Sequence, residues 1–347
     1  MIDKKHSELR GFLRSLTIFA SPFVVLLMLY LLLDPFKVVW SYDSYYPTNV
    51  AGGVSLNPGY VATQNFRQRV DSEHYDSFIL GNSRSIYYPI SAWQEMIGSE
   101  SRCYHFDAAS ESLLGIWQKL RFIEQSGCSI RHLLWVTDAS LLAKTDCDHW
   151  HLCESAPALT NYRNALYFNW YSFKAFISPK FLAAYLDYLS FHQLRPFMLK
   201  ESLLTEDMFC YDAIGNECDF QPLEQMIAEG KYYPAERMKV FEGRQFPDSI
   251  SPSVIGTEQQ VLLDSIATLL ARQETDVQIV ISPLFDQIRL NPQDVSALTK
   301  RFGERCVHDF SGPNEWNRDF KNYYEASHYR RPVAIDILRK IQESRQE

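Results

Sequence analysis

Five short apolar runs, separated by longer amphipathic segments, dominate the chain after residue 70. The runs are 75–80, 103–108, 132–138, 277–283 and 306–310. Such runs are typical of strands buried on both faces of a parallel sheet. Between them, apolar residues recur at helical spacing in 113–126, 257–274, 293–304 and 332–345. This alternation predicts a doubly wound α/β fold with a parallel sheet.

Cap and stop signals support the predicted helices. Gly127 follows the first of them and is a typical helix stop. Thr257 is a suitable N-cap for the second, and Pro332 suits the start of the last helix.

The alternation is interrupted between residues 146 and 255, which are rich in Phe, Tyr and Leu. We interpret this stretch as a helical insertion that either caps the core or contacts a membrane or a membrane partner. The insertion divides the α/β core into 71–145 and 256–347, and residues 36–70 are interpreted as a connector.

An uncharged stretch of nineteen residues, 15–33, lies near the N-terminus. At about 1.5 Å per residue it matches the hydrocarbon thickness of a bilayer. Lys4, Lys5, Arg10 and Arg14 precede it, so residues 1–35 are predicted to be a cytoplasmic tip and a single membrane anchor, with the main domain extracytoplasmic. A cleaved signal peptide is the alternative, but the following 34-DPFK-37 offers no small-residue cleavage site.

Composition narrows the function classes. The chain has 347 residues, of which 46% are hydrophobic and 14% aromatic, so it can bury a sizeable core and is not disordered. Its formal net charge is −8 and it has no long basic block, which argues against a nucleic-acid partner.

Seven cysteines are expected to lie in an oxidising compartment, where disulfides form. Short loops join Cys147 to Cys153 and Cys210 to Cys218, and both pairs are predicted disulfides. Cys103 and Cys128 form a further candidate pair, which leaves Cys306 as a buried apolar thiol. The segment 147-CDHWHLC-153 lacks zinc-finger spacing, so no metal site is predicted.

A small polar cluster, 81-GNSRS-85, follows the first predicted strand. Ligands bind beyond the carboxyl ends of strands in doubly wound sheets, so Ser83 is expected at the mouth of a site. A serine nucleophile needs a base, and the base needs an orienting acid. His328, with Glu325 three residues before it, precedes the last predicted helix and can supply both.

These residues resemble the blocks of the SGNH/GDSL hydrolase superfamily. The segment 81-GNSRS-85 is similar to its first block, and 325-EASHY-329 is similar to its last. The N-terminal anchor and the long insertion resemble the branch of membrane-anchored proteins of alginate acetylation and teichoic-acid D-alanylation. The resemblance implies a flavodoxin-like sheet and cofactor-free acyl transfer or deacylation on a cell-surface glycan or glycopolymer. It also implies a multi-pass membrane O-acyltransferase as partner.

The resemblance assigns Ser83 as nucleophile, His328 as base and Glu325 as the acid, where the family usually has Asp. Ser110 takes the place of a glycine whose backbone N–H joins that of Ser83 in binding the oxyanion. Asp138 takes the place of the family's oxyanion Asn, for which Asn82 is a candidate substitute. Arg84 and Asp138 are candidate substrate contacts, although Arg84 is also suited to anchoring its loop by hydrogen bonds.

Other interpretations of the same residues remain open at this point. The GNS segment is also ordinary turn chemistry, His328 can be a packing histidine, and Asp309 is a competing acid. Structural roles are expected for His74, His105, His132 and His308. The missing oxyanion Asn favours a second function class, a catalytically weak scaffold that binds a glycan or a membrane O-acyltransferase.

Overall fold

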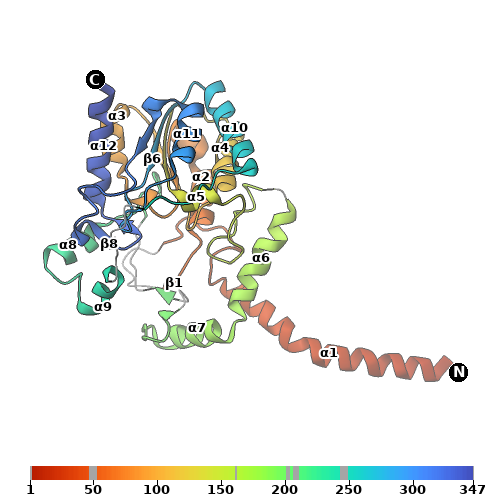
Figure 1. Cartoon of the computed structure of the whole chain (residues 1–347). Helices are drawn as coiled ribbons and strands as arrows, with labels where there is room; N and C mark the ends of the chain where they lie inside the picture. The colour runs from red at the N-terminus through yellow and green to blue at the C-terminus, as the bar shows by residue number, and fades with distance from the viewer. Residues whose placement is uncertain are drawn as a thin grey trace. The chain divides into compact units, whose positions relative to one another are not determined.

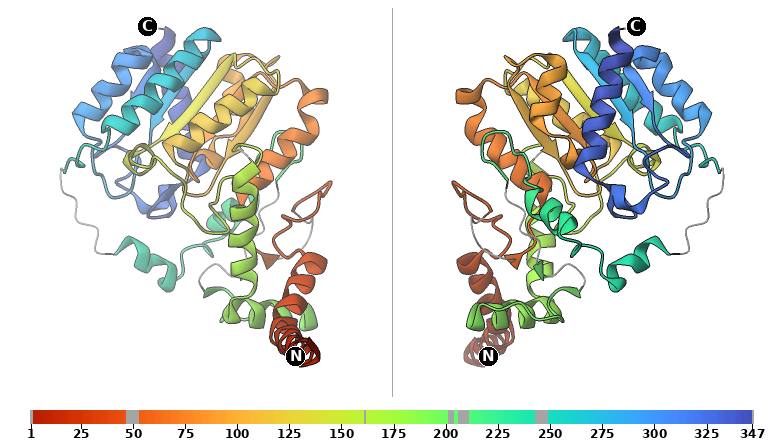
Figure 2. Two further views of the ribbon diagram at one scale, coloured as in Figure 1. Left: turned by 90° about the vertical axis from the view of Figure 1, so that its right-hand side faces the viewer. Right: turned by 90° about the vertical axis from the view of Figure 1, so that its left-hand side faces the viewer.

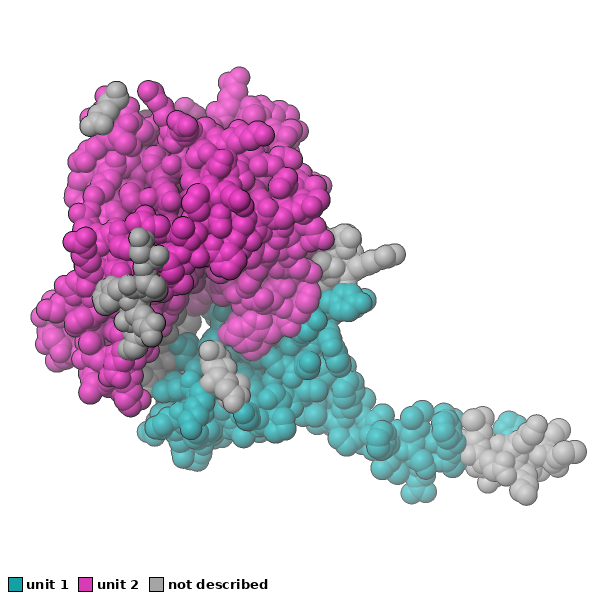
Figure 3. All heavy atoms as spheres, in the orientation of Figure 1, with its two compact units in different colours: residues 1–45, 49–56, 165–208 teal, residues 46–48, 57–164, 209–347 magenta. Residues whose placement is uncertain are grey.

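The computed structural model describes residues 2–46, 53–160, 162–200, 204–205, 211–242 and 249–346. The chain forms two compact units (Figure 3). Unit 1 comprises residues 1–45, 49–56 and 165–208, and unit 2 comprises 46–48, 57–164 and 209–347.

The core of unit 2 is a five-stranded, fully parallel sheet (Figure 1). Its strands are β2 (Ser77–Gly81), β3 (Cys103–Asp107), β4 (His132–Thr137), β6 (Asp276–Ile281) and β7 (Val307–Asp309). They lie in the order β3-β2-β4-β6-β7. This is the flavodoxin-like order, in which the chain reverses direction across the sheet beside β2.

Helices cover both faces of the sheet (Figure 2). Alternate strand residues point to opposite faces, so Phe78 and Leu80 pack on one side and Ile79 on the other. The first face is covered by α2 (Pro58–Glu73), α4 (Leu113–Gln125), α10 (Thr257–Arg272) and α11 (Pro292–Phe302). The second is covered by α3 (Ile90–Ile97) and α12 (Arg331–Gln346). The predicted doubly wound α/β arrangement is confirmed at this level.

Local signals explain where the helices begin. The Ser112 hydroxyl accepts a hydrogen bond from the Gly115 N–H at 3.0 Å and caps α4. Thr257 was expected to cap α10, but it is the first helical residue and Gly256 is the cap. The Gln259 side chain accepts from the Gly256 N–H at 3.1 Å, which satisfies this helix start without a cap hydroxyl.

The predicted connector, 36–70, contains helix α2. Its Ala62 and Phe66 are buried in the core of unit 2. Asn57 caps this helix and Pro58 is its first residue, a common combination at helix starts.

Shorter elements complete unit 2. They are η1 (Ser85–Tyr87), α5 (Ala139–Ala143), α8 (Gln221–Ala228), α9 (Ala235–Met238), η3 (Lys239–Phe241), η4 (Glu304–Cys306), η5 (Phe320–Asn322), β8 (Tyr323–Glu325) and β9 (His328–Tyr329).

Unit 1 contains α1 (Ile2–Leu33), β1 (Gly53–Val54), α6 (Tyr162–Phe176), α7 (Pro179–Phe191) and β5 (Leu204–Thr205). Of the predicted insertion, 146–255, only residues 165–208 belong to this unit. Aromatic contacts hold α6 to α1, because the Phe173 ring lies 5.4 Å from the rings of both Phe23 and Tyr30.

Helix α1 is long and apolar enough over Arg10–Leu33 to cross a membrane, and its most apolar 18-residue window has a mean hydropathy of 2.5. Length and composition alone make it a candidate for a single membrane anchor. The helix ends at Leu33, and the buried carboxylate of the next residue, Asp34, accepts backbone N–H bonds from Val38, Val39 and Trp40 at 2.9–3.0 Å. The chain therefore turns sharply where the apolar segment stops.

The prediction of a Cys147–Cys153 disulfide is wrong for this structure, in which neither cysteine is at bonding distance of another. Residues 148–154 form a tight turn in which the Trp150 carbonyl accepts from the N–H groups of Cys153 and Glu154, and the Cys147 thiol faces Glu154 instead. Cys103 and Cys128 are also unbridged. The predicted Cys210–Cys218 pair lies outside the described residues because Cys210 is not among them. Cys306 packs against the core, as expected of an apolar thiol.

Candidate active site

Strand β2 delivers Ser83 to the carboxyl edge of the sheet through a turn that requires glycine. A Cβ atom on Gly81 would lie 2.5 Å from the Val136 carbonyl oxygen, too close for any side chain. The turn is then fixed by Asn82, whose side-chain oxygen accepts from the Arg84 N–H at 3.1 Å. Its backbone carbonyl accepts from the Ser85 N–H at 2.9 Å. Ser83 is left partly exposed at the apex.

A β-hairpin presents the histidine. Glu325 in β8 is paired with His328 in β9, and Ala326 and Ser327 form the turn between them. Residues paired across such a turn have side chains on the same face, so the hairpin alone brings the carboxylate and the imidazole together. The sequence predicts a simple loop here.

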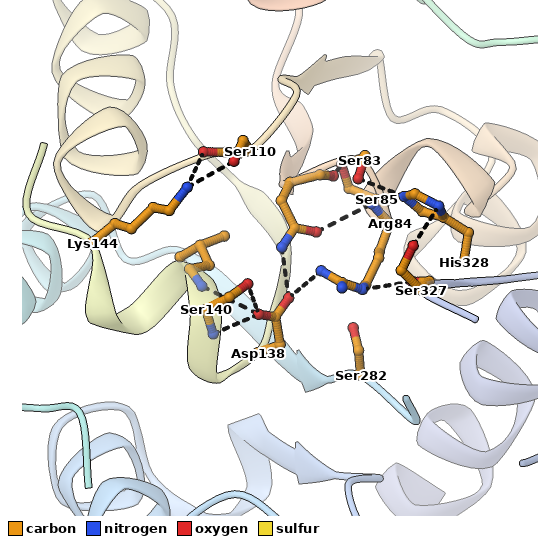
Figure 4. A network of polar contacts seen from close by, with 12 residues as sticks. Ser83, Arg84, Ser85, Ser110, Asp138, Ser140, Lys144, Ser282, Ser327 and His328 are labelled. Carbon is orange, nitrogen blue, oxygen red and sulfur yellow. Dashed lines mark hydrogen bonds and ion pairs between the residues drawn. The ribbon is translucent and has the colours of Figure 1, made fainter. Parts of the chain in front are cut away.

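The two segments, 245 residues apart, meet in the structure (Figure 4). Ser83 Oγ lies 2.7 Å from His328 Nε2, within the distance of about 3–4 Å predicted from the sequence. His328 Nδ1 bonds to Glu325 Oε1 on its other side. The arrangement is a serine–imidazole–carboxylate chain in which Nδ1–H donates to Glu325 and the Nε2 lone pair faces the serine hydroxyl.

Glu325 is suited to the acid position despite its extra methylene. Its hydrogen bond to His328 lowers the pKa of the carboxyl to about 2, so it is ionised at neutral pH. Ser327 bonds to both partners, since its hydroxyl lies 2.8 Å from Glu325 Oε1 and 3.1 Å from His328 Nδ1. The competing acid, Asp309, instead accepts from the Ser311 N–H at 2.9 Å and from its hydroxyl.

An ion pair between Arg84 and Asp138 supports the Ser83 turn. Arg84 Nη1 lies 2.7 Å from Asp138 Oδ2, and Arg84 Nε donates to the Ser327 carbonyl at 2.9 Å. Arg84 therefore joins the Ser83 turn to the β8–β9 hairpin. The side chains are only 13% and 3% exposed, so the structure favours this anchoring role over the predicted substrate contact for both residues.

Asp138 accepts hydrogen bonds from two segments, the Ser83 turn and the start of α5. It accepts from Asn82 Nδ2 at 2.6 Å and from the Ser140 and Leu141 N–H groups at the start of α5. Burial alone would raise the pKa of Asp138, but Arg84, Ser140 and Asn82 together lower it below its usual value. The carboxylate is therefore an acceptor that orders the site and not an oxyanion donor.

The predicted oxyanion donors differ in whether their N–H groups are free to bind a substrate oxygen. No acceptor for the Ser83 backbone N–H is found within the described part of the chain, so that group is available to a substrate oxygen. Asn82 is buried and its amide donates to Asp138, which argues against its role as a substitute donor.

Ser110 adopts a left-handed backbone conformation, with φ at +54°. Glycine accommodates this conformation more readily than serine does. Its hydroxyl donates to Asp148 at 2.6 Å and accepts from Lys144 Nζ at 2.7 Å, on the side away from His328 in Figure 4. Only its backbone N–H remains a candidate donor.

The other singled-out histidines lie in structural settings. His105 is buried and bonds to the Tyr88 carbonyl, and burial lowers its pKa to about 4. His308 Nε2 lies 2.8 Å from Gln278 Oε1. His132 Nδ1 lies 3.5 Å from Asp276, and His74 forms the left-handed C-cap of α2.

Two neighbours of the site were not anticipated from the sequence. Ser327 gives no separate signal beyond its place inside 325-EASHY-329. The Tyr87 ring lies 5.7 Å from the His328 ring and forms an apolar wall beside it.

A surface hollow lined by Tyr75, Gln94 and Arg102 lies at the amino ends of β2 and β3, the opposite edge of the sheet from Ser83.

No family model matches this chain, and no curated protein matches it at a significant level.

Proposed function

We propose that this protein is a membrane-anchored, extracytoplasmic serine acyltransferase or esterase with an SGNH/GDSL-like site, acting on O-acyl groups of a cell-surface glycan or glycopolymer. The observation that carries the proposal is the Ser83–His328–Glu325 chain at the carboxyl edge of a parallel sheet. Convergence of a serine, a histidine and an acid at that edge is the arrangement that acyl transfer needs.

The chemistry follows from the contacts. Ser83 Oγ attacks the acyl carbon while His328 Nε2 takes the hydroxyl proton, and the adjacent carboxylate of Glu325 stabilises the imidazolium. The tetrahedral intermediate collapses when His328 gives that proton to the leaving oxygen, which leaves an acyl ester on Ser83. A sugar hydroxyl or water then loses its proton to His328 and attacks the ester, and Ser83 is released with the proton returned. No cofactor is needed in this sequence.

The oxyanion site is sparse. The backbone N–H of Ser83 is the clearest donor, and Asp138 stands where the family has a donating Asn. Loss of one oxyanion donor typically lowers the rate about 100- to 1000-fold. We therefore expect slow turnover of simple esters.

Membrane anchorage is supported by the apolar helix and by the basic residues before it, which favour a cytoplasmic N-terminus. The stretch 15–33 is only about 29 Å long as a helix, so all of it is needed to span a bilayer. Phe23 lies near its middle and contacts Phe173 of α6. The neighbouring exposed Trp170 is consistent with a part of α6 entering the outer half of the bilayer.

The substrate and the partner are inferred from the resemblance alone. A multi-pass membrane O-acyltransferase would supply acyl groups at the membrane surface, where an anchored enzyme can receive them.

A second candidate function is a catalytically weak scaffold that keeps the fold and binds a glycan or the membrane O-acyltransferase. The observation that favours it is the replacement of the oxyanion Asn by Asp138, whose carboxylate is engaged by four residues.

A fluorophosphonate probe distinguishes the two candidates. Full-length protein in detergent should be labelled, and S83A and H328A should not, whereas S265A on the surface of α10 should be labelled like the wild type. Folded protein that resists the probe would favour the scaffold.

A further inference from the structure

We propose that residues 146–155 form a binding site for a divalent transition metal, best matched by Zn²⁺, with Cys147, His149 and Glu154 as its protein ligands. The Cys147 sulfur lies 3.7 Å from His149 Nδ1 and 3.7 Å from Glu154 Oε1. His149 Nδ1 lies 3.0 Å from Glu154 Oε2. Thiolate, imidazole and carboxylate are the ligand types that zinc sites use.

The spacing of these atoms fits one face of a tetrahedron. Zinc bonds of about 2.3 Å to sulfur and about 2.0–2.1 Å to nitrogen and oxygen place the sulfur about 3.5 Å from the other two donors. They place nitrogen and oxygen about 3.3 Å apart. The observed distances differ from these by only a few tenths of an ångström, but the sulfur and the imidazole nitrogen face different oxygens of the Glu154 carboxylate. One donor atom from each side chain lies within 4.8 Å of the other two, so one ion can reach all three side chains with small adjustments.

The Asp146 carboxylate contacts two of the ligand residues. Asp146 Oδ2 lies 3.5 Å from His149 Nε2, so a carboxylate faces the nitrogen that would not bind the ion. Metal-ligating histidines commonly have such a partner, because it holds the proton on the far nitrogen. The other oxygen of the same carboxylate, Asp146 Oδ1, accepts from the Cys147 backbone N–H at 2.8 Å.

The loop is also fixed to the fold. Asn57 Nδ2 donates to the carbonyls of His151 and Glu154 at 3.2 and 2.9 Å. The Glu154 side chain is 5% exposed and that of His149 is 52% exposed, so the site would open to solvent on one side. Three protein ligands leave a fourth position for water. The proposed ligand set differs from the motif 147-CDHWHLC-153, because it includes Glu154 and leaves out Cys153.

Metal binding here would also bear on the candidate active site. Asp148 lies between two of the ligands and accepts from Ser110 Oγ at 2.6 Å. An ion that binds Cys147 and His149 would therefore restrict the position of Asp148 and, through its hydrogen bond, that of Ser110.

Cobalt titration of metal-stripped, full-length protein in detergent tests the site. We expect a near-ultraviolet thiolate-to-cobalt band that saturates at one equivalent and is displaced by Zn²⁺. C147S should lose the band, and H149A should bind more than about tenfold more weakly. C128S, which removes a half-buried cysteine elsewhere, should behave like the wild type.

Wild-type protein that gives no band at micromolar cobalt and retains no Zn²⁺ would overturn the proposal. So would peptide mapping that finds a Cys147–Cys153 disulfide in protein from native membranes. Neither result depends on how C147S or H149A folds. Labelling of Ser83 by the fluorophosphonate probe is measured separately, so a failure of the metal site is distinguishable from a failure of the proposed acyl transfer.

Discussion

Replacing Arg84 by alanine should destabilise the protein by about 3–5 kcal/mol, because it leaves a buried charge without its partner. Asp138 is 3% exposed and its oxygen lies 2.7 Å from the guanidinium, so the carboxylate cannot regain water when Arg84 is removed. The substitution also removes the bond to the Ser327 carbonyl, which joins the two halves of the site. A shift of about 1 Å between Ser83 and His328 is enough to lower activity about 100-fold.

Urea unfolding of full-length protein in detergent, followed by tryptophan fluorescence, measures the effect. R84A/D138N should be less destabilised than the sum of the two single variants, since neither charge then remains. The matched control is R301A, which breaks the Arg301–Asp264 pair at 2.6 Å, where Asp264 is 64% exposed. That change should cost less than about 1 kcal/mol. If R84A costs no more than R301A, the buried pair does not support the site and the reasoning fails.

The pKa of Glu325 is about 2 in the folded protein and about 4.3 in the unfolded chain. The ionised carboxylate therefore stabilises the fold above about pH 5, and this stabilisation is lost as the pH falls toward 2. The stability advantage of wild type over E325Q should therefore shrink between about pH 5 and pH 3, and an advantage that grows would contradict the assignment. The S110G variant should be more stable than S110A by about 1 kcal/mol, because both lose the hydroxyl but only glycine tolerates the positive φ without strain. Equal midpoints in urea unfolding would argue against backbone strain at this position. A reporter fused after Glu347 should be active only outside the cytosol, and cytosolic activity alone would reverse the proposed orientation.

The sheet was predictable because buried parallel strands leave a local signal. All five apolar runs contain a strand, since each is short and rich in apolar residues. Helix α2 was overlooked inside a stretch rich in Tyr, Gly, Asn and Pro, although Asn57-Pro58 is a recognisable helix start. The pairing of 165–208 with α1 depends on aromatic contacts between distant segments, for which one sequence gives no signal.

The candidate site also has a part that could be predicted from the sequence and a part that could not. Ser83 and His328 were predictable because each lies beside the carboxyl end of a strand, and the topology brings such ends to one edge. The Arg84–Asp138 support was not, because a charged residue in a turn looks the same in the sequence whether it faces solvent or a buried partner. The cysteine prediction failed because spacing along the chain does not fix the direction of the Cβ atoms, on which disulfide formation depends.

The central claim is that Ser83 carries the acyl group during turnover. Full-length protein mixed with an activated acetyl ester, quenched in acid within seconds and mapped by mass spectrometry, tests it directly. The account predicts an acetyl group on the peptide that contains Ser83, absent from S83A and H328A. Acetyl transfer that continues in S83A, or a wild-type protein acylated only at another residue, would contradict it.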